Sequence, residues 1–190
     1  MNRIAVDVDE CLVQFLYPMA KHHHRVIRKP RFNYVYRQIF DIDEESSRRM
    51  VREFYRSEAF LYLTPIKNSQ EAMYRLRRRA DKMYVVTGRQ DVVRDETETW
   101  IETYFPGVFD DVILTNSFTS NEVSKVDICR ALNLGLIIDD QKSTCDRCME
   151  ELGIRAFNYV GDPMYEWCEE SDISFKHWSS IQTGTSEYIP

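Results

Sequence analysis

The chain has 190 residues, of which 43% are hydrophobic and 13% aromatic, and this composition can bury one sizeable core with a small accessory domain. Its formal charge of −6 and pI near 5.3 argue against a protein that coats nucleic acid, although a local basic face is compatible with them. No segment has the length of a transmembrane helix, the amino terminus lacks a basic and apolar leader, and the five cysteines are odd in number. We therefore expect a cytoplasmic protein in a reducing compartment, with no membrane partner.

The first predicted strand ends in two aspartates. Ile4, Val6 and Val8 are β-forming residues, and Asp7 and Asp9 lie where the chain leaves this buried strand. Ionised carboxylates in such a place are costly unless a cation compensates them, so a metal ion is the natural partner. The simpler alternative is that both acids cap the strand and bind turn amides.

The next stretch, residues 15–61, has helical periodicity in pieces, and we predict that it forms a small helical cap over the first strand. From Leu12 to Phe40 the sequence contains no acid, while cations and aromatic residues alternate. Such a segment can face an aromatic ligand that carries phosphate, or it can be a solvated basic helix whose aromatic residues pack inward. The cations are Lys21, Arg25, Arg28, Lys29, Arg31 and Arg37.

Two local patterns could suggest a metal site but favour simpler interpretations. His22, His23 and His24 are consecutive, and consecutive helical residues point about 100° apart, so the three rings cannot converge on one ion. We expect surface or rim histidines, with contact to a substrate phosphate as the alternative. Cys145 and Cys148 form a C-x-x-C without a second pair at zinc-finger spacing, so we expect two buried apolar side chains.

The second strand is predicted at 85–87, after a helix that Asn68 and Glu71 are expected to cap. The arginine-rich end of that helix, residues 75–79, is expected to lie mostly in solvent. The strand ends at Thr87, and Gly88 and Arg89 follow it. Backbone amides at such a turn can receive phosphate oxygens, and Arg89 either binds substrate or braces the site.

The remainder of the chain alternates between helices and strands. Helices are predicted at 92–105, 121–132 and 143–152, with Gly153 as the cap of the last one, and strands at 112–115, 136–138 and 154–160. Trp167 and Trp178 are expected to anchor the tail by packing. This alternation predicts an α/β fold with a doubly wound parallel sheet, which binds ligands at the carboxyl ends of its strands.

Four of these elements carry side chains that suit phosphoryl transfer. Asp7 and Asp9 end the first strand, Thr87 ends the second, Lys125 lies on a later helix, and the strand at 136–138 runs into Asp139 and Asp140. An apolar strand seldom ends in two acids without a cation or a cap. A carboxylate pair, a hydroxyl, an ammonium and a second carboxylate pair together predict a phosphoryl-transfer site.

The order Asp-x-Asp, Thr, Lys, Asp-Asp resembles the four motifs of the haloacid dehalogenase-like phosphatases. The resemblance runs from Arg3 to about Ile181. Within that superfamily the chain looks most like the 5′(3′)-deoxyribonucleotidase-like 5′-nucleotidase branch, because the helical insert and the Ile-Asp-Asp ending of the fourth motif also match. It departs from the pattern at Glu10 and Cys11, where the family usually has a glycine or another small residue followed by Thr or Val.

This resemblance implies a Rossmann-like core of residues 1–14 and 62–190, a helical cap of residues 15–61, and Mg²⁺ as the cofactor. Asp7 would be the nucleophile, and Asp9 would be the general acid and base and a metal ligand through its backbone carbonyl. Asp7 and Asp140 would bind the metal directly, and Asp139 would support them. Thr87, Gly88, Arg89 and Lys125 would bind the substrate phosphate.

The implied function is a phosphomonoester hydrolase that forms an aspartyl phosphate, with a nucleoside monophosphate as substrate. A polynucleotide 3′-phosphatase would use the same motifs on DNA or RNA ends. A non-catalytic interaction module is a third alternative, and a phosphotransferase or dehalogenase would share the fold, although Asp9 favours phosphoester hydrolysis. The oligomeric state stays open, with a dimer as one outcome.

Overall fold

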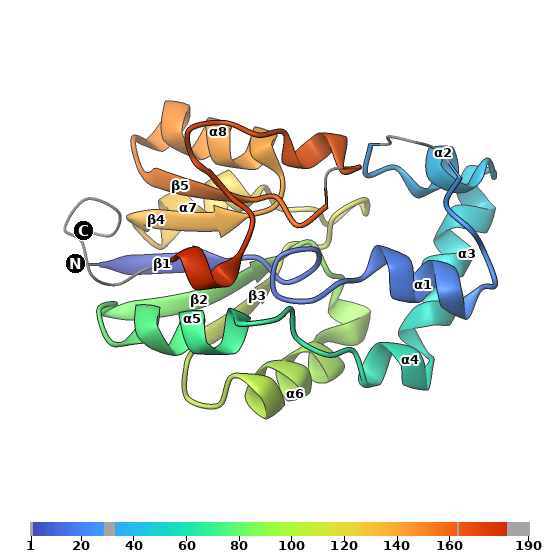
Figure 1. Cartoon of the computed structure of the whole chain (residues 1–190), viewed down its shortest axis with the longest axis horizontal. Helices are drawn as coiled ribbons and strands as arrows, with labels where there is room; N and C mark the ends of the chain where they lie inside the picture. The colour runs from blue at the N-terminus through green and yellow to red at the C-terminus, as the bar shows by residue number, and fades with distance from the viewer. Residues whose placement is uncertain (1, 29–32, 163, 182–190) are drawn as a thin grey trace.

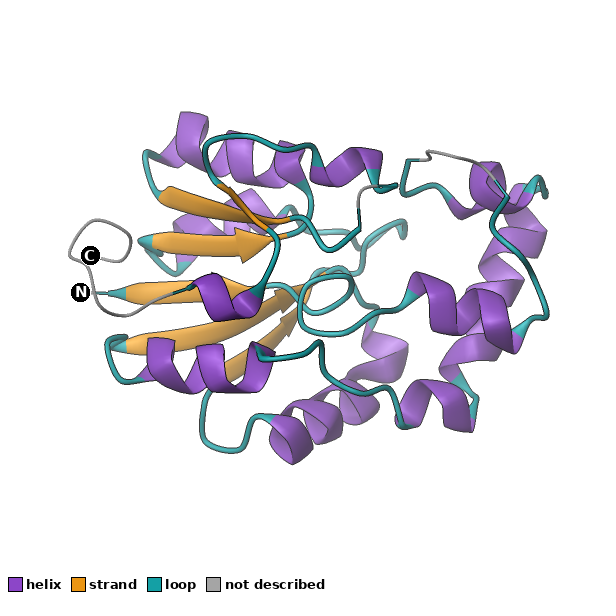
Figure 2. Ribbon diagram, viewed as in Figure 1, coloured by secondary structure: helices purple, strands orange, loops and turns teal. Residues whose placement is uncertain are grey.

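The structure, a computed structural model, describes residues 2–28, 33–162 and 164–181. Its centre is a six-stranded sheet in the order β3-β2-β1-β4-β5-β6, in which every neighbouring pair is parallel (Figure 2). Helices flank this sheet, so the predicted α/β fold with a doubly wound parallel sheet is confirmed (Figure 1). The strands are β1 (Arg3–Val6), β2 (Lys82–Thr87), β3 (Asp111–Leu114), β4 (Leu136–Asp139), β5 (Arg155–Tyr159) and β6 (Ser174–Phe175).

Five helices of the described residues lie between β1 and β2, and the first four of them form a separate group. Figure 1 places these four at one end of the molecule, beyond the carboxyl ends of the strands, and we call residues 15–61 the insert. The insert contains α1 (Leu16–His22), α2 (Tyr36–Phe40), α3 (Glu44–Tyr55) and α4 (Glu58–Leu61). The later helices are α5 (Ser69–Arg77), α6 (Arg94–Tyr104), α7 (Lys125–Ala131) and α8 (Lys142–Leu152), with 3₁₀ turns η1 (Asp91–Val93), η2 (Glu166–Cys168) and η3 (Trp178–Ser180).

The central position of β1 aligns the ends of three strands. Its apolar residues, from Ile4 to Val6, are fully buried, as expected for a strand covered on both faces. Val6 pairs with Val85 of β2 on one side and with Ile138 of β4 on the other. The residues that follow these three partners therefore leave the sheet side by side at its carboxyl edge.

Asn68 directly precedes α5, as predicted, but the predicted capping interaction does not form, and the start of α7 was predicted too early. Asn68 has a left-handed backbone with φ of 67°, and its side chain makes no capping hydrogen bond. A capping side chain needs an extended backbone to reach the first amides of the helix, so the predicted pair with Glu71 does not form. The helix expected from residue 121 begins at Lys125, because Ser124 is its cap and accepts a hydrogen bond from the Val126 amide at 3.2 Å.

Several smaller predictions are confirmed. Gly153 ends α8 in the left-handed conformation, with φ of 66°. Cys145 and Cys148 are fully buried, whereas His22 and His24 are exposed. Trp178 is a fully buried anchor of the tail. None of the helices among the described residues could span a bilayer.

Candidate active site

Three carboxylates converge at the carboxyl edge of the sheet. Asp7 follows β1, Asp139 is the last residue of β4, and Asp140 follows it. Each offers an oxygen within 4.8 Å of the others, and all three side chains are buried. The Asp7 amide donates to the Ile138 carbonyl at 2.9 Å, which extends the β1–β4 pairing as far as the cluster.

Lys125 is the cation of this cluster. Its Nζ lies 2.9 Å from Oδ2 of Asp7 and 2.7 Å from Oδ2 of Asp139. Burial alone would lower the pKa of this ammonium, but the carboxylates of Asp139 and Asp7 raise it well above its ordinary value. Lys125 is therefore charged, and one ammonium faces three buried acids.

The carboxylates of the cluster differ in whether their oxygens have hydrogen-bond partners in the protein. Asp139 is fully engaged, because its Oδ2 binds Lys125 and its Oδ1 accepts the Gln141 amide at 2.9 Å. Oδ1 of Asp7 is buried and has no hydrogen-bond partner among the described residues. Burial raises the pKa of Asp7 to about 6, against the opposing effect of Lys125. A buried acceptor without a donor is costly, so this oxygen calls for a cation or an electrophile.

The cluster suits a hard divalent cation. Magnesium is usually bound in proteins by one or two carboxylates, and waters or substrate phosphate complete its octahedron. Asp7 supplies an open carboxylate oxygen, and Asp140 lies beside it with one oxygen bound to Trp167. The residues therefore fit Mg²⁺ with Asp7 and Asp140 as ligands and Asp139 in support.

Asp9 faces a different partner. Nη2 and Nε of Arg89 lie 2.7 Å from Oδ1 and 3.0 Å from Oδ2 of Asp9, in a two-pronged ion pair. Arg89 is only 2% exposed; it also donates to Thr97 Oγ1 at 3.2 Å, and its guanidinium lies 4.9 Å from the ring centroid of Phe60. Of the two roles considered for Arg89, this geometry corresponds to the brace. The Asp9 side chain is outside the carboxylate cluster, and metal binding by its backbone carbonyl stays a prediction.

The turn after β2 brings the second motif close to a neighbouring loop. A side chain at Gly88 would place its Cβ 3.1 Å from Oγ of Ser117, so Ser117 would have to shift by a few tenths of an ångström to admit it. Gly88, Arg89 and Lys125 line the same cavity as Asp7. Thr87 is fully buried behind them, and its Oγ1 accepts the Arg89 amide at 3.3 Å.

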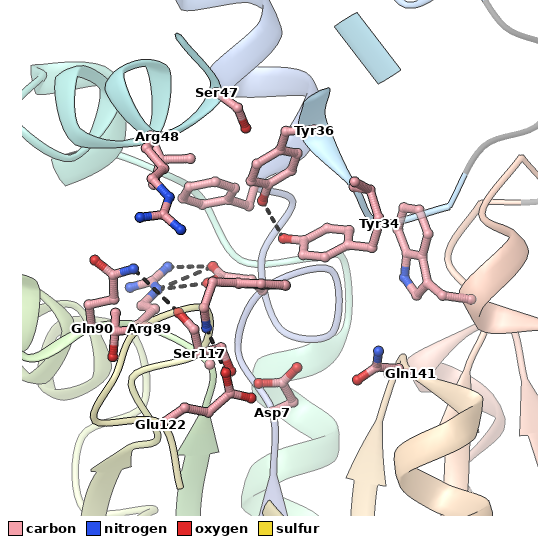
Figure 3. A pocket seen from close by; sticks show the side chains of 18 of the residues that line it. Asp7, Tyr34, Tyr36, Ser47, Arg48, Arg89, Gln90, Ser117, Glu122 and Gln141 are labelled. Atoms are coloured by element: carbon pink, nitrogen blue, oxygen red, sulfur yellow. Dashed lines mark hydrogen bonds and ion pairs between the residues drawn. The ribbon is translucent and has the colours of Figure 1, made fainter. Parts of the chain in front are cut away.

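The cavity has a volume of about 640 Å³ and lies between the insert and the core loops (Figure 3). This size is typical of sites for small organic ligands. The carboxylate cluster forms its floor, and α3 contributes to the opposite wall. Of the predicted basic stretch, Arg37 lines the cavity and Arg28 is exposed away from it, while Lys29 and Arg31 lie outside the described residues. The aromatic lining residues are Phe15, Tyr34, Tyr36, Tyr55, Phe118 and Trp167.

Two site residues escaped the sequence prediction. Trp167 was expected only to pack, but its Nε1 donates to Oδ2 of Asp140 at 2.6 Å and its ring lines the cavity. Asn158 of β5 donates to the carbonyl oxygens of Asp139 and Asp140, at 3.2 and 2.8 Å. The only signal for Asn158 was an amide inside a buried strand, and Trp167 gave none because its contact is purely tertiary.

Glu10, where the sequence departs from the family pattern, also has a structural role. Glu10 has a left-handed backbone with φ of 59°, a conformation in which glycine is favoured. Its Oε1 accepts the amides of Phe15 and Leu16 at 2.9 and 2.6 Å, and its Oε2 accepts the Tyr165 hydroxyl at 2.8 Å. Burial raises the pKa of this carboxyl to about 7. Glu10 thus joins the end of β1 to the start of α1 and to the tail.

A parallel sheet in this order, with acids after β1 and β4, a lysine between them and a helical insert after β1, is the architecture of haloacid dehalogenase-like proteins. The sequence matches no family model and no curated protein. Solved structures of that class do resemble it, at TM-scores of 0.58 to 0.63 and identities of 10 to 12%, and this likeness shows the fold. The chain has the haloacid dehalogenase-like fold.

Three of these structures indicate the range. The haloacid dehalogenase-like hydrolase SP0104 from Streptococcus pneumoniae has a TM-score of 0.63 at 12% identity, over 87% of this chain and 88% of its own. A hydrolase from Deinococcus radiodurans, with bound phosphate and sodium, has a TM-score of 0.63 at 10% identity over 95% and 93%. CbbY from Rhodobacter sphaeroides, in complex with xylulose 1,5-bisphosphate, has a TM-score of 0.58 at 12% identity over 95% and 96%.

Proposed function

We propose that this protein is a Mg²⁺-dependent phosphomonoester hydrolase that works through an aspartyl phosphate on Asp7. The observation that carries the proposal is Asp7, which lines the cavity beside Lys125 and whose buried Oδ1 has no hydrogen-bond partner among the described residues. The fold is also that of a hydrolase crystallised with phosphate and of CbbY bound to a sugar bisphosphate.

In the first step a carboxylate oxygen of Asp7 forms a bond to phosphorus while the bond to the leaving oxygen breaks. Lys125 offsets the repulsion between this carboxylate and the anionic phosphoryl group, and the backbone of Gly88 and Arg89 lies at the same edge of the cavity. Magnesium, held by Asp7 and Asp140, would supply charge neutralisation and orientation of the phosphoryl oxygens.

Asp9 handles the protons in this scheme. It gives a proton to the leaving oxygen, and it then removes one from the water that attacks the aspartyl phosphate and releases inorganic phosphate. Its carboxylate lines the same cavity as Asp7, and the ion pair with Arg89 fixes its orientation. In this geometry both carboxylate oxygens of Asp9 accept hydrogen bonds from Arg89, so one of them must be released before it can carry the proton.

Residues 15–61 act as the cap in this proposal, over a core formed by residues 1–14 and 62–190. The wall of the cavity combines aromatic rings from the insert with Trp167 of the tail, and its volume of about 640 Å³ accommodates far more than a phosphate. Both features support a nucleoside monophosphate as the first candidate substrate, because a base can stack on such rings.

The test is hydrolysis of p-nitrophenyl phosphate with Mg²⁺ and with EDTA, followed by a panel of nucleoside monophosphates and DNA 3′-phosphate ends. We expect activity only with the metal, and a loss of several orders of magnitude in Asp7→Asn, because the amide is no nucleophile. Asp127→Asn, an exposed acid on α7, is the control and should keep full activity. Metal-independent turnover, or an active Asp7→Asn, would refute the proposal. If the protein prefers DNA 3′-phosphate ends, the polynucleotide end and not the nucleoside monophosphate would be its substrate.

A further inference from the structure

One face of α3 forms the wall of the cavity that lies opposite the carboxylate cluster. Ser47, Arg48, Val51, Arg52 and Tyr55 line the cavity, at the spacing of a single helical face. In Figure 3 the Arg48 side chain extends from α3 into the cavity, towards the core. The wall of the cavity opposite the carboxylate cluster therefore contains two arginines, one helical turn apart.

These cations are poorly compensated by the protein. Nε of Arg48 donates to Oε1 of Glu44 at 3.0 Å, and Nη1 of Arg37 donates to Oε2 of the same glutamate at 3.1 Å. Two arginines thus share one acid. Arg52 forms no ion pair with any acid in the part of the chain that the structure describes. In a chain with a net charge of −6, an excess of positive charge on this wall is a specific local feature.

The other lining acids are committed elsewhere. Asp9 is bound by Arg89, and Glu122 on the core rim accepts the Phe118 amide at 2.8 Å. The remaining acids belong to the cluster on the floor. Opposite charges are therefore separated along the cavity: the acids and Lys125 lie at the reacting end, and arginines that the described acids compensate only in part lie at the far end.

We propose that the substrate carries a second anionic group, a phosphate or a carboxylate, at the end remote from the scissile phosphate, and that Arg48 and Arg52 bind it. This inference rests on the proposed hydrolase function and specifies its substrate class. Planar guanidinium groups are suited to hydrogen-bonding such oxygens in pairs. A substrate with a neutral remote end would leave Arg52 without an anion among the described residues and Arg48 with only Glu44, which it shares with Arg37.

The proposal predicts which ester is the better substrate in pairs that differ by one anionic group. Adenosine 3′,5′-bisphosphate should be a better substrate than adenosine 5′-monophosphate, and fructose 1,6-bisphosphate better than fructose 6-phosphate. Because the extra binding lies far from the reacting atoms, it should appear mainly in KM. A preference for the doubly anionic ester in both the nucleotide pair and the sugar pair would show that the enzyme needs a second anion and not a base. Comparing phosphoglycolate with ethyl phosphate tests whether a carboxylate can serve as the second anion.

The matched variants are Arg48→Gln, Arg52→Gln and their combination, with Arg49→Gln as the control. Arg49 is the exposed neighbour of Arg48 on the same helix, and it does not line the cavity. The double variant removes both guanidinium groups that would hydrogen-bond the second anion, and hydrogen bonds between charged groups are among the strongest in proteins. The double variant should therefore lose roughly 10²-fold or more in kcat/KM on doubly anionic esters, mostly in KM. It should change less than about threefold on singly anionic esters and on p-nitrophenyl phosphate.

Two results would overturn the inference while leaving the hydrolase intact. One is a wild-type enzyme that hydrolyses p-nitrophenyl phosphate but shows no preference for the second anion in any pair. The other is an equal loss on both members of each pair in the double variant, which would assign the arginines to cap structure or closure. Failure of the wild-type protein to hydrolyse any ester, with Mg²⁺ present, would overturn both the hydrolase and the inference.

Discussion

Asp140 is the residue whose setting departs most from the sequence prediction. The acid itself was predicted, but its orientation depends on Trp167, whose Nε1 donates to Oδ2 at 2.6 Å, and on Asn158, which holds its carbonyl. The Trp167 ring is in turn stacked on Tyr165, with centroids 4.3 Å apart, and it meets Tyr34 of the insert edge-on at 4.7 Å. Aromatic residues of the tail and of the insert therefore position a proposed metal ligand together.

Replacing Trp167 by phenylalanine should weaken Mg²⁺ binding. The change keeps an aromatic ring but removes the N–H that orients Asp140, and loss of such an outer partner typically costs 10- to 100-fold in metal affinity. Calorimetric titration with Mg²⁺ measures the effect. Trp178→Phe is the matched control, because it loses a similar indole hydrogen bond, to the Cys11 carbonyl at 3.0 Å, away from the cluster. Equal Mg²⁺ affinity in the two variants would show that Trp167 only packs.

The residues of the site were predictable to different degrees. Asp7, Asp139 and Asp140 could be found because each lies at or next to a recognisable strand end, and parallel strands bring such ends to one edge. Lys125 was singled out by the family resemblance, because its helix was predicted to begin at residue 121. The ion pair of Arg89 with a carboxylate 80 positions away could not be found, because nothing local specifies it. Partners chosen by tertiary packing leave no periodic signal in the sequence.

At the scale of elements, the turn from β1 into α1 is organised by Glu10. A left-handed residue at this position would normally be glycine, since a side chain there costs about 1 to 2 kcal/mol. Here the carboxylate compensates by accepting two amides at the start of α1 and the Tyr165 hydroxyl of the tail. The departure from the family pattern is therefore consistent with the same turn, stabilised by a side chain.

Glu10→Gln should become more stable, relative to wild type, as the pH rises. The folded-state pKa of Glu10 is raised from 4.5 to about 7, so the folded protein binds this proton more tightly than the unfolded chain does. Ionisation therefore removes stability as the pH rises from 4.5 to about 7, by roughly 3 kcal/mol in all. Glutamine cannot ionise, and its amide oxygen can still accept the two backbone amides.

The measurement is denaturant unfolding of both proteins in EDTA, from pH 4.5 to pH 8. The difference in free energy of unfolding should move in favour of Glu10→Gln across this window and then stay constant. Glu102→Gln, an exposed acid on α6, should run parallel to wild type. A difference between Glu10→Gln and wild type that does not depend on pH would mean that the folded state does not raise the pKa of Glu10.

Element boundaries show where local signals are weak. The strands β1, β2 and β4 were predictable because they are apolar runs that end in polar residues. The start of α7 was placed too early, because the residues before Ser124 are compatible with both turn and helix. The two-residue strand β6 was not predicted, since its pairing with β5 depends on the rest of the sheet.

At the scale of the whole molecule, the alternation of strands and helices was sufficient for the sheet but not for the cavity. Of the predicted cations of the 12–40 segment, Arg37 lines the described cavity, and Lys29 and Arg31 lie outside the described residues. Arg48 and Arg52 of α3, which the sequence did not single out, also line the cavity. Which face of an insert helix turns towards the core depends on how the whole insert packs. Periodicity alone shows that such a face exists, without naming what it covers.

The central claim, that Asp7 carries the phosphoryl group, is tested most directly by trapping it. Wild-type protein turning over p-nitrophenyl phosphate with Mg²⁺ is quenched in acid and reduced with borohydride, which converts an aspartyl phosphate into homoserine. Mass spectrometry of the peptide that contains residues 4–12 should then find homoserine at position 7. Asp7→Asn should give none. Homoserine at another aspartate, or full turnover without any trapped residue, would contradict the assignment of Asp7 as the nucleophile.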